Sequence, residues 1–283
     1  MSLPIVYLHG WGMRGRIFVG VEKSWSDLNF TDFIPPLSPN PSPARGEGSK
    51  WSNTSPARGE GSELGSDPNL FPDLPGYGDA ALPDDYRVAS LADVLSERAP
   101  EKIILLGWSM GSLIAQAWAV RHPEQVAALV LVAATPCFQQ RTDWPHGLST
   151  ADVEAFSSGV ASDWRTTLNR FLSLQARGSE DARHLIAQLR AELAAGVDPS
   201  PETLAAGMRL LAETDLRDQA AAITQPTLLI HGGRDGLCPL PGAAWLAAQI
   251  PNARLAVIER AAHAPFLSHP GEFSALLREF VDE

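Results

Sequence analysis

The feature that most constrains this chain is the pentapeptide Gly-Trp-Ser-Met-Gly at residues 107–111. An unbroken apolar run, residues 103–106, precedes it, and an apolar-periodic stretch from Ser112 to Val120 follows it. This context predicts a buried strand, a tight turn and a helix. A side chain at either glycine would crowd the crossing of strand and helix, while Ser109 is presented at the turn. The sequence therefore predicts a parallel α/β sheet with a nucleophilic serine at the end of one strand. The alternative is a glycine-rich turn that carries an ordinary serine.

A second motif lies near the N-terminus, where His9-Gly10-Trp11-Gly12 follows the strand-like residues 4–8. In hydrolytic sites built on such a turn, a loop after an early strand donates one backbone N–H to the oxyanion, and the residue after the nucleophile donates the other. We therefore expect the amides of Trp11 and Met110 to form an oxyanion hole, each donor being worth on the order of 3 kcal/mol of barrier. His9 is expected to shape this loop rather than to transfer protons.

Candidates for an acid and a base follow two strand-like segments near the C-terminus. Residues 227–231 predict a strand, and Asp235 lies in the turn after it. Residues 255–259 predict another strand, and His263 lies in its loop. The chain order Ser109, Asp235, His263 is that of α/β-hydrolases and differs from those of chymotrypsin and subtilisin. Because open α/β sheets bind ligands beyond the carboxyl ends of their strands, we predict that these three residues form a catalytic triad.

Other histidines and aspartates compete for these roles. His269 is the main rival base, but it precedes Pro270 at the start of a predicted helix, which is a capping position. Asp215 and Asp218 lie on a helix-like segment and are expected to be surface charges, with Asp215 the next candidate acid. The remaining histidines after the first motif are assigned to a helix end, a helical insert or the end of a strand: His122, His146, His184 and His231.

Composition limits the other possibilities. With 283 residues, 45% of them hydrophobic and 19% charged, the chain has the composition of an ordinary globular enzyme. A net charge of −11 argues against nucleic acid as a partner, because phosphate binding needs clusters of basic side chains. The longest apolar run, residues 126–134, is too short to span a bilayer, and no secretory signal is expected. The two cysteines, Cys137 and Cys238, fit a reducing cytoplasm, and without metal-ligand or phosphate-loop motifs we expect a monomer that needs no cofactor.

The pattern divides the chain into the first part of an α/β core, a helical lid over the serine and the second part of the core: residues 1–135, 136–222 and 223–283. The expected strands are residues 5–9, a short one near Phe71, 103–106, 128–132, 227–231 and 255–259. The expected lid helices are residues 164–175, 179–195 and 201–213. Within residues 38–69 the sequence Ser-Pro-Ala-Arg-Gly-Glu-Gly-Ser occurs at 42–49 and again at 55–62. Proline, glycine and serine dominate this segment, so we expect a disordered insertion rather than a ligand-binding repeat.

The predicted lid contains a segment whose charge is opposite to that of the rest of the chain. Between Trp164 and Arg190, five arginines outnumber Glu180 and Asp181, which gives this segment a net charge of +3. The arginines are Arg165, Arg170, Arg177, Arg183 and Arg190. One interpretation is a solvated helix surface. The other is a docking patch for an acidic partner, because arginine forms bidentate contacts with carboxylates and phosphates.

Taken together, the chain resembles the BioH-type pimeloyl-[acyl-carrier protein] methyl ester esterases of biotin synthesis, within the α/β-hydrolase superfamily. The matching segments are residues 8–12, 73–78, 106–111, 136–138, 170–175, 235–237 and 261–266. The resemblance covers nearly everything except the repeat insert. The serine turn and the triad are common to the superfamily. Three features are more specific to the esterase family: Trp11 and Trp108, the Pro-Cys-Phe sequence at 136–138 and the Arg-Phe-Leu-x-Leu-Gln sequence at 170–175. The chain departs from the pattern at Ser112, where a glycine is usual, in the insert and in the absence of leading strands.

The resemblance implies hydrolysis of a pimeloyl methyl ester on acyl carrier protein by Ser109, Asp235 and His263. It implies a substrate site formed by Trp11, Ser109, Met110, Phe171, Leu172, Ser173, Leu174, Gln175 and His263. It also implies that the lid arginines receive the acidic carrier protein: Arg170 and Arg183 match the family's basic positions, and Arg165, Arg177 and Arg190 are shifted from them. The alternatives are a general small-ester or carbon–carbon bond hydrolase and a catalytically silent ligand receptor.

Overall fold

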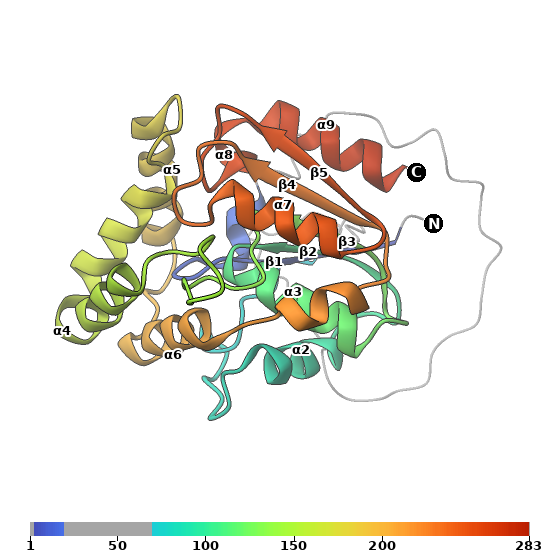
Figure 1. Ribbon diagram of the computed structural model, residues 1–283. Coiled ribbons are helices and arrows are strands. Elements are labelled where there is room, and N and C mark those ends of the chain that lie inside the picture. Colours follow the sequence, from blue (N-terminus) through green and yellow to red (C-terminus); the bar gives the residue numbers. More distant parts are fainter. Residues whose placement is uncertain (1–2, 20–69, 283) are drawn as a thin grey trace, which may run out of the picture.

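A five-stranded parallel sheet forms the centre of the computed structural model, which describes residues 3–19 and 70–282 (Figure 1). The strands lie in the order β1 (Ile5–Leu8), β2 (Ile103–Trp108), β3 (Val126–Val132), β4 (Thr227–Gly232) and β5 (Ala253–Ile258). The expected short strand near Phe71 is reduced to one bridge, in which Leu70 pairs with Val6 in parallel. The insert at residues 38–69 lies outside the described residues.

The strands are apolar on both faces, as a parallel sheet covered by helices requires. Val6, Leu105 and Leu131 belong to one hydrophobic cluster, which includes residues of α2 (Val88–Ser96), α3 (Met110–Arg121) and α7 (Leu240–Gln249). Tyr7 and Leu106 belong to a second cluster, which includes residues of η1 (Gly15–Phe18), α8 (Pro265–Ser268) and α9 (Pro270–Val281). Successive strand residues thus point to opposite faces, and helices cover both.

A block of helices lies between β3 and β4 in the chain: α4 (Thr150–Gln175), α5 (Ala182–Ala194) and α6 (Pro201–Glu213), followed by η3 (Arg217–Ala222). The expected helix 164–175 is the second half of α4. The backbone leaves the helical region at Asp163, with φ −151° and ψ 83°, and the Asp163 carboxylate accepts the Thr166 N–H, which caps the second half.

The expected lid region begins with a loop. Residues 136–149 form turns and isolated bridges, so His146 lies in a loop and not in a helix. Trp144 anchors this loop, because its indole N–H donates to the Cys137 carbonyl and its ring packs edge-on against Trp245.

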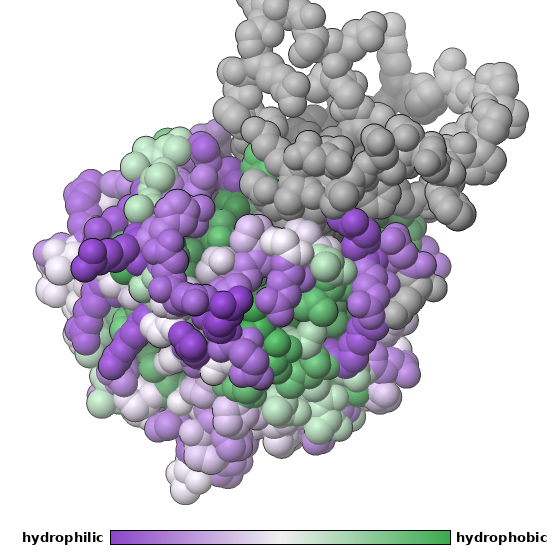
Figure 2. All heavy atoms as spheres, turned by 90° about the horizontal axis from the view of Figure 1, so that it is seen from above, coloured by the Kyte–Doolittle hydropathy of each residue, from purple (hydrophilic) through white to green (hydrophobic). Residues whose placement is uncertain are grey.

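The helical block lies beside one end of the sheet, and α6 packs against α4 (Figure 1). Hydrophilic side chains dominate the exposed surface of this block, which is on the left in both Figure 1 and Figure 2. Within residues 3–19 and 70–282, no helix is both long and apolar enough to cross a membrane.

Candidate active site

Three polar side chains meet where strands of the sheet end. Ser109 follows β2, Asp235 follows β4 and His263 follows β5, and the carboxyl ends of parallel strands share one edge of a sheet. His263 Nε2 lies 2.8 Å from Ser109 Oγ, and His263 Nδ1 lies 2.8 Å from Asp235 Oδ2. All three residues are buried: Ser109 is 6% exposed, His263 1% and Asp235 7%. The structure therefore brings the predicted triad together as one buried hydrogen-bonded chain.

The backbone is strained at the turn that contains Ser109. Ser109 has φ 55° and ψ −119°, in a region that non-glycine residues rarely adopt. A Cβ at Gly107 would overlap the Gly111 carbonyl, and a Cβ at Gly111 would overlap the Leu8 carbonyl. Glycine is therefore needed at both positions, because the backbone there lies too close to other backbone atoms to leave room for a side chain.

Ser112, where the resembling family has a glycine, is accommodated by a hydrogen bond. Its hydroxyl is buried and donates to the Ser109 carbonyl over 2.6 Å. The Ser112 N–H donates to the same carbonyl at 2.8 Å. This side chain thus adds a contact to the serine turn.

Hydrogen bonds to both oxygens fix the orientation of the Asp235 carboxylate. Oδ1 accepts the N–H groups of Leu237 and Cys238, each at 2.9 Å, and this leaves Oδ2 for His263. Burial alone would raise the pKa of Asp235, but the charge and hydrogen bond of His263, with smaller contributions from His231 and the Cys238 amide, hold this pKa below its ordinary value. Asp235 is therefore ionised and can hold His263 with Nε2 facing the serine.

A second histidine, which the sequence had assigned to the end of a strand, lies beside the acid. His231 on β4 is buried, with Nε2 2.7 Å from the Cys238 carbonyl and 3.6 Å from Asp235 Oδ2. Burial lowers the pKa of His231. Because a carbonyl only accepts, the neutral ring carries its proton on Nε2 and helps to hold the turn that contains Asp235.

The main chain of His263 is fixed from two sides. Its N–H donates to the carbonyl of Gln175, the last residue of α4, and its carbonyl accepts the indole N–H of Trp108 at 2.7 Å. The helical block thus contacts the base directly.

The two expected oxyanion donors lie at the ends of adjacent strands. Met110 is the first residue of α3, where helix N–H groups have no partner within the helix, and Trp11 lies in the loop after β1. Within the part of the chain that is described, neither amide has a backbone or side-chain hydrogen-bond partner. The side chain of Trp11 is held by α6, because its indole N–H donates to the Leu204 carbonyl.

The other expected substrate residues are the last five of α4. Phe171 packs edge-on against Trp11, with ring centroids 4.7 Å apart, whereas Leu172 is buried in the second hydrophobic cluster. Ser173 and Leu174 are half-buried, and the Ser173 hydroxyl donates back to the Asn169 carbonyl. Gln175 is buried.

The rival residues lie outside this arrangement. His269 occupies the N-cap position of α9, as expected, although its side chain makes no capping hydrogen bond. The Asp215 carboxylate pairs with Arg217 at 2.7 Å. His122 pairs with Asp93 at 2.8 Å. None of these residues contacts the triad.

His9 is buried at the start of the loop after β1. Burial lowers the pKa of His9 to about 4, with Asp73 opposing the shift, so the ring is neutral. Its Nδ1 lies 2.9 Å from the Gly10 carbonyl, and its Nε2 accepts the Leu74 N–H at 2.9 Å.

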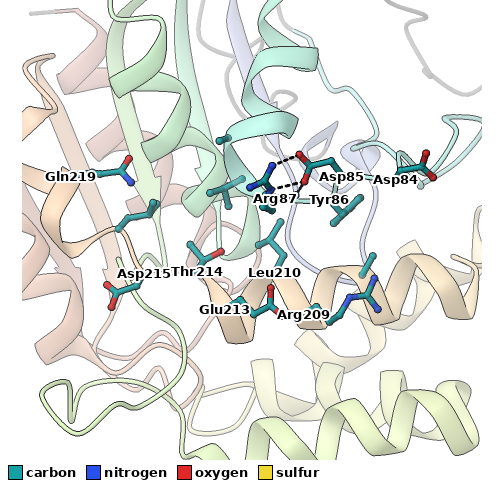
Figure 3. Close-up of a pocket in the computed structure, with 14 residues that line it drawn as sticks. Asp84, Asp85, Tyr86, Arg87, Arg209, Leu210, Glu213, Thr214, Asp215 and Gln219 are labelled. Carbon is teal, nitrogen blue, oxygen red and sulfur yellow. Dashed lines mark hydrogen bonds and ion pairs between the residues drawn. The ribbon is translucent and has the colours of Figure 1, made fainter.

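Two cavities flank the helical block. One of about 420 Å³ lies between α4 and the loop that follows Asp235, and is lined by Leu148, Asp152, Phe156, Arg170, Leu174, Arg177, Gly178, Arg234, Gly236 and Leu237. The other, about 530 Å³, lies between the start of α2 and the C-terminal half of α6 (Figure 3). No triad residue lines either cavity. Asp85 on the wall of the larger cavity is paired with Arg87. In residues 3–19 and 70–282, no group of three or more histidines, cysteines and acids could hold a metal ion.

Comparison with known proteins agrees with this geometry. Residues 70–270 match the family model described as alpha/beta hydrolase fold. A pimeloyl-[acyl-carrier protein] methyl ester esterase of Nitrosomonas europaea is 42% identical over 204 residues, which cover 71% of this chain and 80% of the relative. An esterase of the same name from Aromatoleum aromaticum is 37% identical, and the match covers 99% of this chain and 99% of the relative. Another from Aeromonas hydrophila is 34% identical, and the match covers 98% of this chain and 94% of the relative.

Solved structures share the fold. An esterase from Exiguobacterium antarcticum superimposes with a TM-score of 0.76 and 24% identity, and the match covers 100% of this chain and 94% of the esterase. The chain therefore belongs to the α/β-hydrolase fold family and, within it, to the family of the pimeloyl-[acyl-carrier protein] methyl ester esterases.

Proposed function

We propose that this protein is a serine carboxylesterase that hydrolyses the methyl ester of pimeloyl-[acyl-carrier protein] to pimeloyl-[acyl-carrier protein] and methanol, a step of biotin synthesis. The observation that carries the proposal is the buried hydrogen-bonded chain of Ser109, His263 and Asp235 at the strand ends. The relatives named for this reaction, at 34–42% identity, support the substrate.

The geometry supports a two-step mechanism. Ser109 Oγ attacks the ester carbonyl while His263 Nε2 accepts its proton, and the same proton then leaves with methanol. Water hydrolyses the resulting acyl-enzyme with His263 again as base. Ionised Asp235 orients His263 and stabilises its charged form. The amides of Trp11 and Met110 stabilise the oxyanion of both tetrahedral intermediates.

The smaller cavity supports binding of an acyl chain that is attached to an acidic carrier. Its apolar walls, including Phe156, Leu174 and Leu237, suit methylene groups, and Gly236 and Leu237 directly follow the acid of the triad. Arg170 and Arg177 line the same cavity from α4 and the turn after it. A cavity with guanidinium groups beside apolar walls matches a substrate whose reacting end is apolar and whose carrier is anionic.

The lid arginines support docking of the carrier protein. All five are exposed, and only Arg165 has an ion-pair partner among the residues described, Asp198 at 3.3 Å. The other four guanidinium groups are available to an acidic surface: Arg170, Arg177, Arg183 and Arg190. We include in the proposal that the enzyme acts as a cytoplasmic monomer without a cofactor; Cys137 and Cys238 are both free thiols.

The decisive experiment is methanol release from the carrier-linked methyl ester by the purified protein. We expect turnover, and we expect Ser109→Ala to lower it by about a millionfold. Ser96→Ala, which removes a buried hydroxyl at the end of α2, is the matched control and should keep full activity. The wild-type gene should also restore growth without biotin to a strain that lacks its esterase.

Two outcomes would replace the proposal. Hydrolysis of small nitrophenyl esters without hydrolysis of the carrier-linked ester would identify a general small-ester hydrolase. Binding of the acyl carrier without hydrolysis of either ester would identify a silent receptor.

A further inference from the structure

The backbone around Trp11 is held by two buried side chains that take no part in the mechanism above. One is His9, and the other is Tyr77, which lies 65 residues beyond Gly12 in the sequence. The two rings pack edge to face, with centroids 4.8 Å apart. They belong to the segments that follow β1 and the bridge at Leu70.

His9 holds the peptide group that precedes Trp11. Its Nε2 accepts the Leu74 N–H, so the ring proton is on Nδ1 and is donated to the Gly10 carbonyl. The Gly10 carbonyl and the Trp11 N–H belong to the same planar trans peptide and point in opposite directions. Fixing the carbonyl therefore fixes the direction of the N–H.

Tyr77 holds the next peptide group. The Gly12 N–H donates to the Tyr77 hydroxyl at 3.1 Å, and Gly12 has φ 75°, in the left-handed region that favours glycine. Both peptide groups that join at the Trp11 Cα are thus anchored: the first by His9 and the second by Tyr77. Without the hydroxyl, the Gly12 N–H would be a buried donor with no partner in the fold, and the loop would relax to satisfy it.

We propose that the Tyr77 hydroxyl is a positioning group for the oxyanion hole, which fixes the Trp11 amide through Gly12. This inference rests on the proposed role of Trp11 as an oxyanion donor and adds a residue that the triad and oxyanion motifs do not contain. A positioning group of this kind acts on the transition state and leaves binding of the ground-state substrate unchanged.

The test compares Tyr77→Phe with wild type on p-nitrophenyl butyrate, which needs only Ser109 chemistry. We expect kcat to fall by about tenfold to a hundredfold, less than for loss of an oxyanion donor itself, with KM within about twofold. Affinity for a trifluoromethyl ketone, which forms a tetrahedral adduct with the serine, should fall by the same factor as kcat.

Tyr86→Phe is the matched control. The Tyr86 hydroxyl is also buried and donates to the Pro75 carbonyl at 2.9 Å, in the same 73–78 segment, but among the described residues it makes no hydrogen bond to residues 9–12. This variant should lower the melting temperature without changing kcat. If Tyr77→Phe does not fold, a fluorinated tyrosine at position 77, whose oxygen is a weaker acceptor, replaces it and should lower kcat relative to the same residue at position 86.

Two results would overturn the proposal: kcat and ketone affinity of Tyr77→Phe within about twofold of wild type, or equal losses in Tyr77→Phe and Tyr86→Phe. Failure of the proposed function is seen separately, as wild-type protein that does not hydrolyse the carrier-linked methyl ester. Because the carrier-linked ester and p-nitrophenyl butyrate are assayed separately, the comparison on p-nitrophenyl butyrate still decides the role of Tyr77.

Discussion

His9 shows how burial changes the role of a residue that is chemically able to catalyse. A histidine with a pKa of about 4 is neutral at physiological pH, and both of its nitrogens are used by backbone groups, Gly10 and Leu74. It therefore has no free nitrogen to exchange a proton with a substrate. Its hydrogen bonds instead stabilise the loop in one conformation.

The lowered pKa of His9 predicts how stability depends on pH. Unfolded chains protonate histidine near its ordinary value of 6.5, and the folded protein does so only near 4, so the unfolded state binds more protons between these values. Stability should therefore fall as the pH is lowered from 6.5 towards 4, and His9 should contribute on the order of 3 kcal/mol of this loss.

Urea unfolding of the wild type and of His9→Gln, at about pH 7 and at about pH 4, measures this contribution. The variant should lose less stability between the two pH values than the wild type, because it has no proton to bind at position 9. His231, whose pKa is also lowered, is present in both proteins and cancels in the comparison. Equal losses would contradict the assignment.

The triad residues could be predicted from local sequence, and their neighbours could not. Ser109, Asp235 and His263 each follow an apolar run with turn residues, so the pattern gives both their type and their place at a strand end. The contacts of Tyr77 with Gly12 and of His231 with Asp235 depend on how separate segments pack. A tyrosine in a glycine-rich turn gave no signal of its partner.

At the scale of secondary-structure elements, the second half of α4 places consecutive side chains in different surroundings. Phe171 packs against Trp11, while Arg170 is exposed and lies over the Phe156 ring. Helical periodicity predicted this half of α4, but not the first half or the break at Asp163. The break could not be predicted, because it depends on one aspartate that caps a new helix.

The charges on this face predict a test of docking. Arg170→Glu combined with Arg183→Glu should lower kcat/KM for the carrier-linked ester by about tenfold or more, most strongly at low ionic strength, because the positive surface attracts the acidic carrier. Turnover of p-nitrophenyl acetate should stay within about twofold, since neither residue belongs to the triad.

The matched control is Arg121→Glu, which reverses an exposed charge on α3 that pairs with Asp93, outside the helical block. It should affect neither substrate. Equal losses on both substrates in the double variant would show that the arginines stabilise the helical block, and no loss on either would remove the docking surface from the proposal.

At the scale of the whole molecule, the described residues form a continuous sheet and both hydrophobic clusters without residues 38–69. The composition of that segment also predicts that it adds no core. We therefore expect that replacing residues 38–69 by a short Gly/Ser linker leaves esterase activity within a few-fold and the melting temperature nearly unchanged. An activity loss above about a hundredfold in a folded protein would show that the segment contributes to the site.

The parallel direction of the strands followed from the alternation of apolar runs and helices. Their order in the sheet was not predicted from the sequence and comes from the structure. The fold class was confirmed. The reduction of the strand near Phe71 to one bridge was harder to predict, because the apolar run there is short and follows the insert.

The contact of α6 with the loop after β1 restricts how this enzyme can be re-engineered. A Cβ at Gly207 would lie 2.6 Å from the Trp11 ring and 3.3 Å from the Met110 sulfur. Since β3 and β4 are neighbours in the sheet, a different set of helices could be grafted between them without rearranging the strands. Such a graft would keep the hydrolytic site only if it carried a glycine facing Trp11, a free carbonyl for the Trp11 indole N–H and a carbonyl in the place of that of Gln175, which accepts the His263 N–H. A chimera library built on this scaffold should therefore hold these three positions constant and vary the rest.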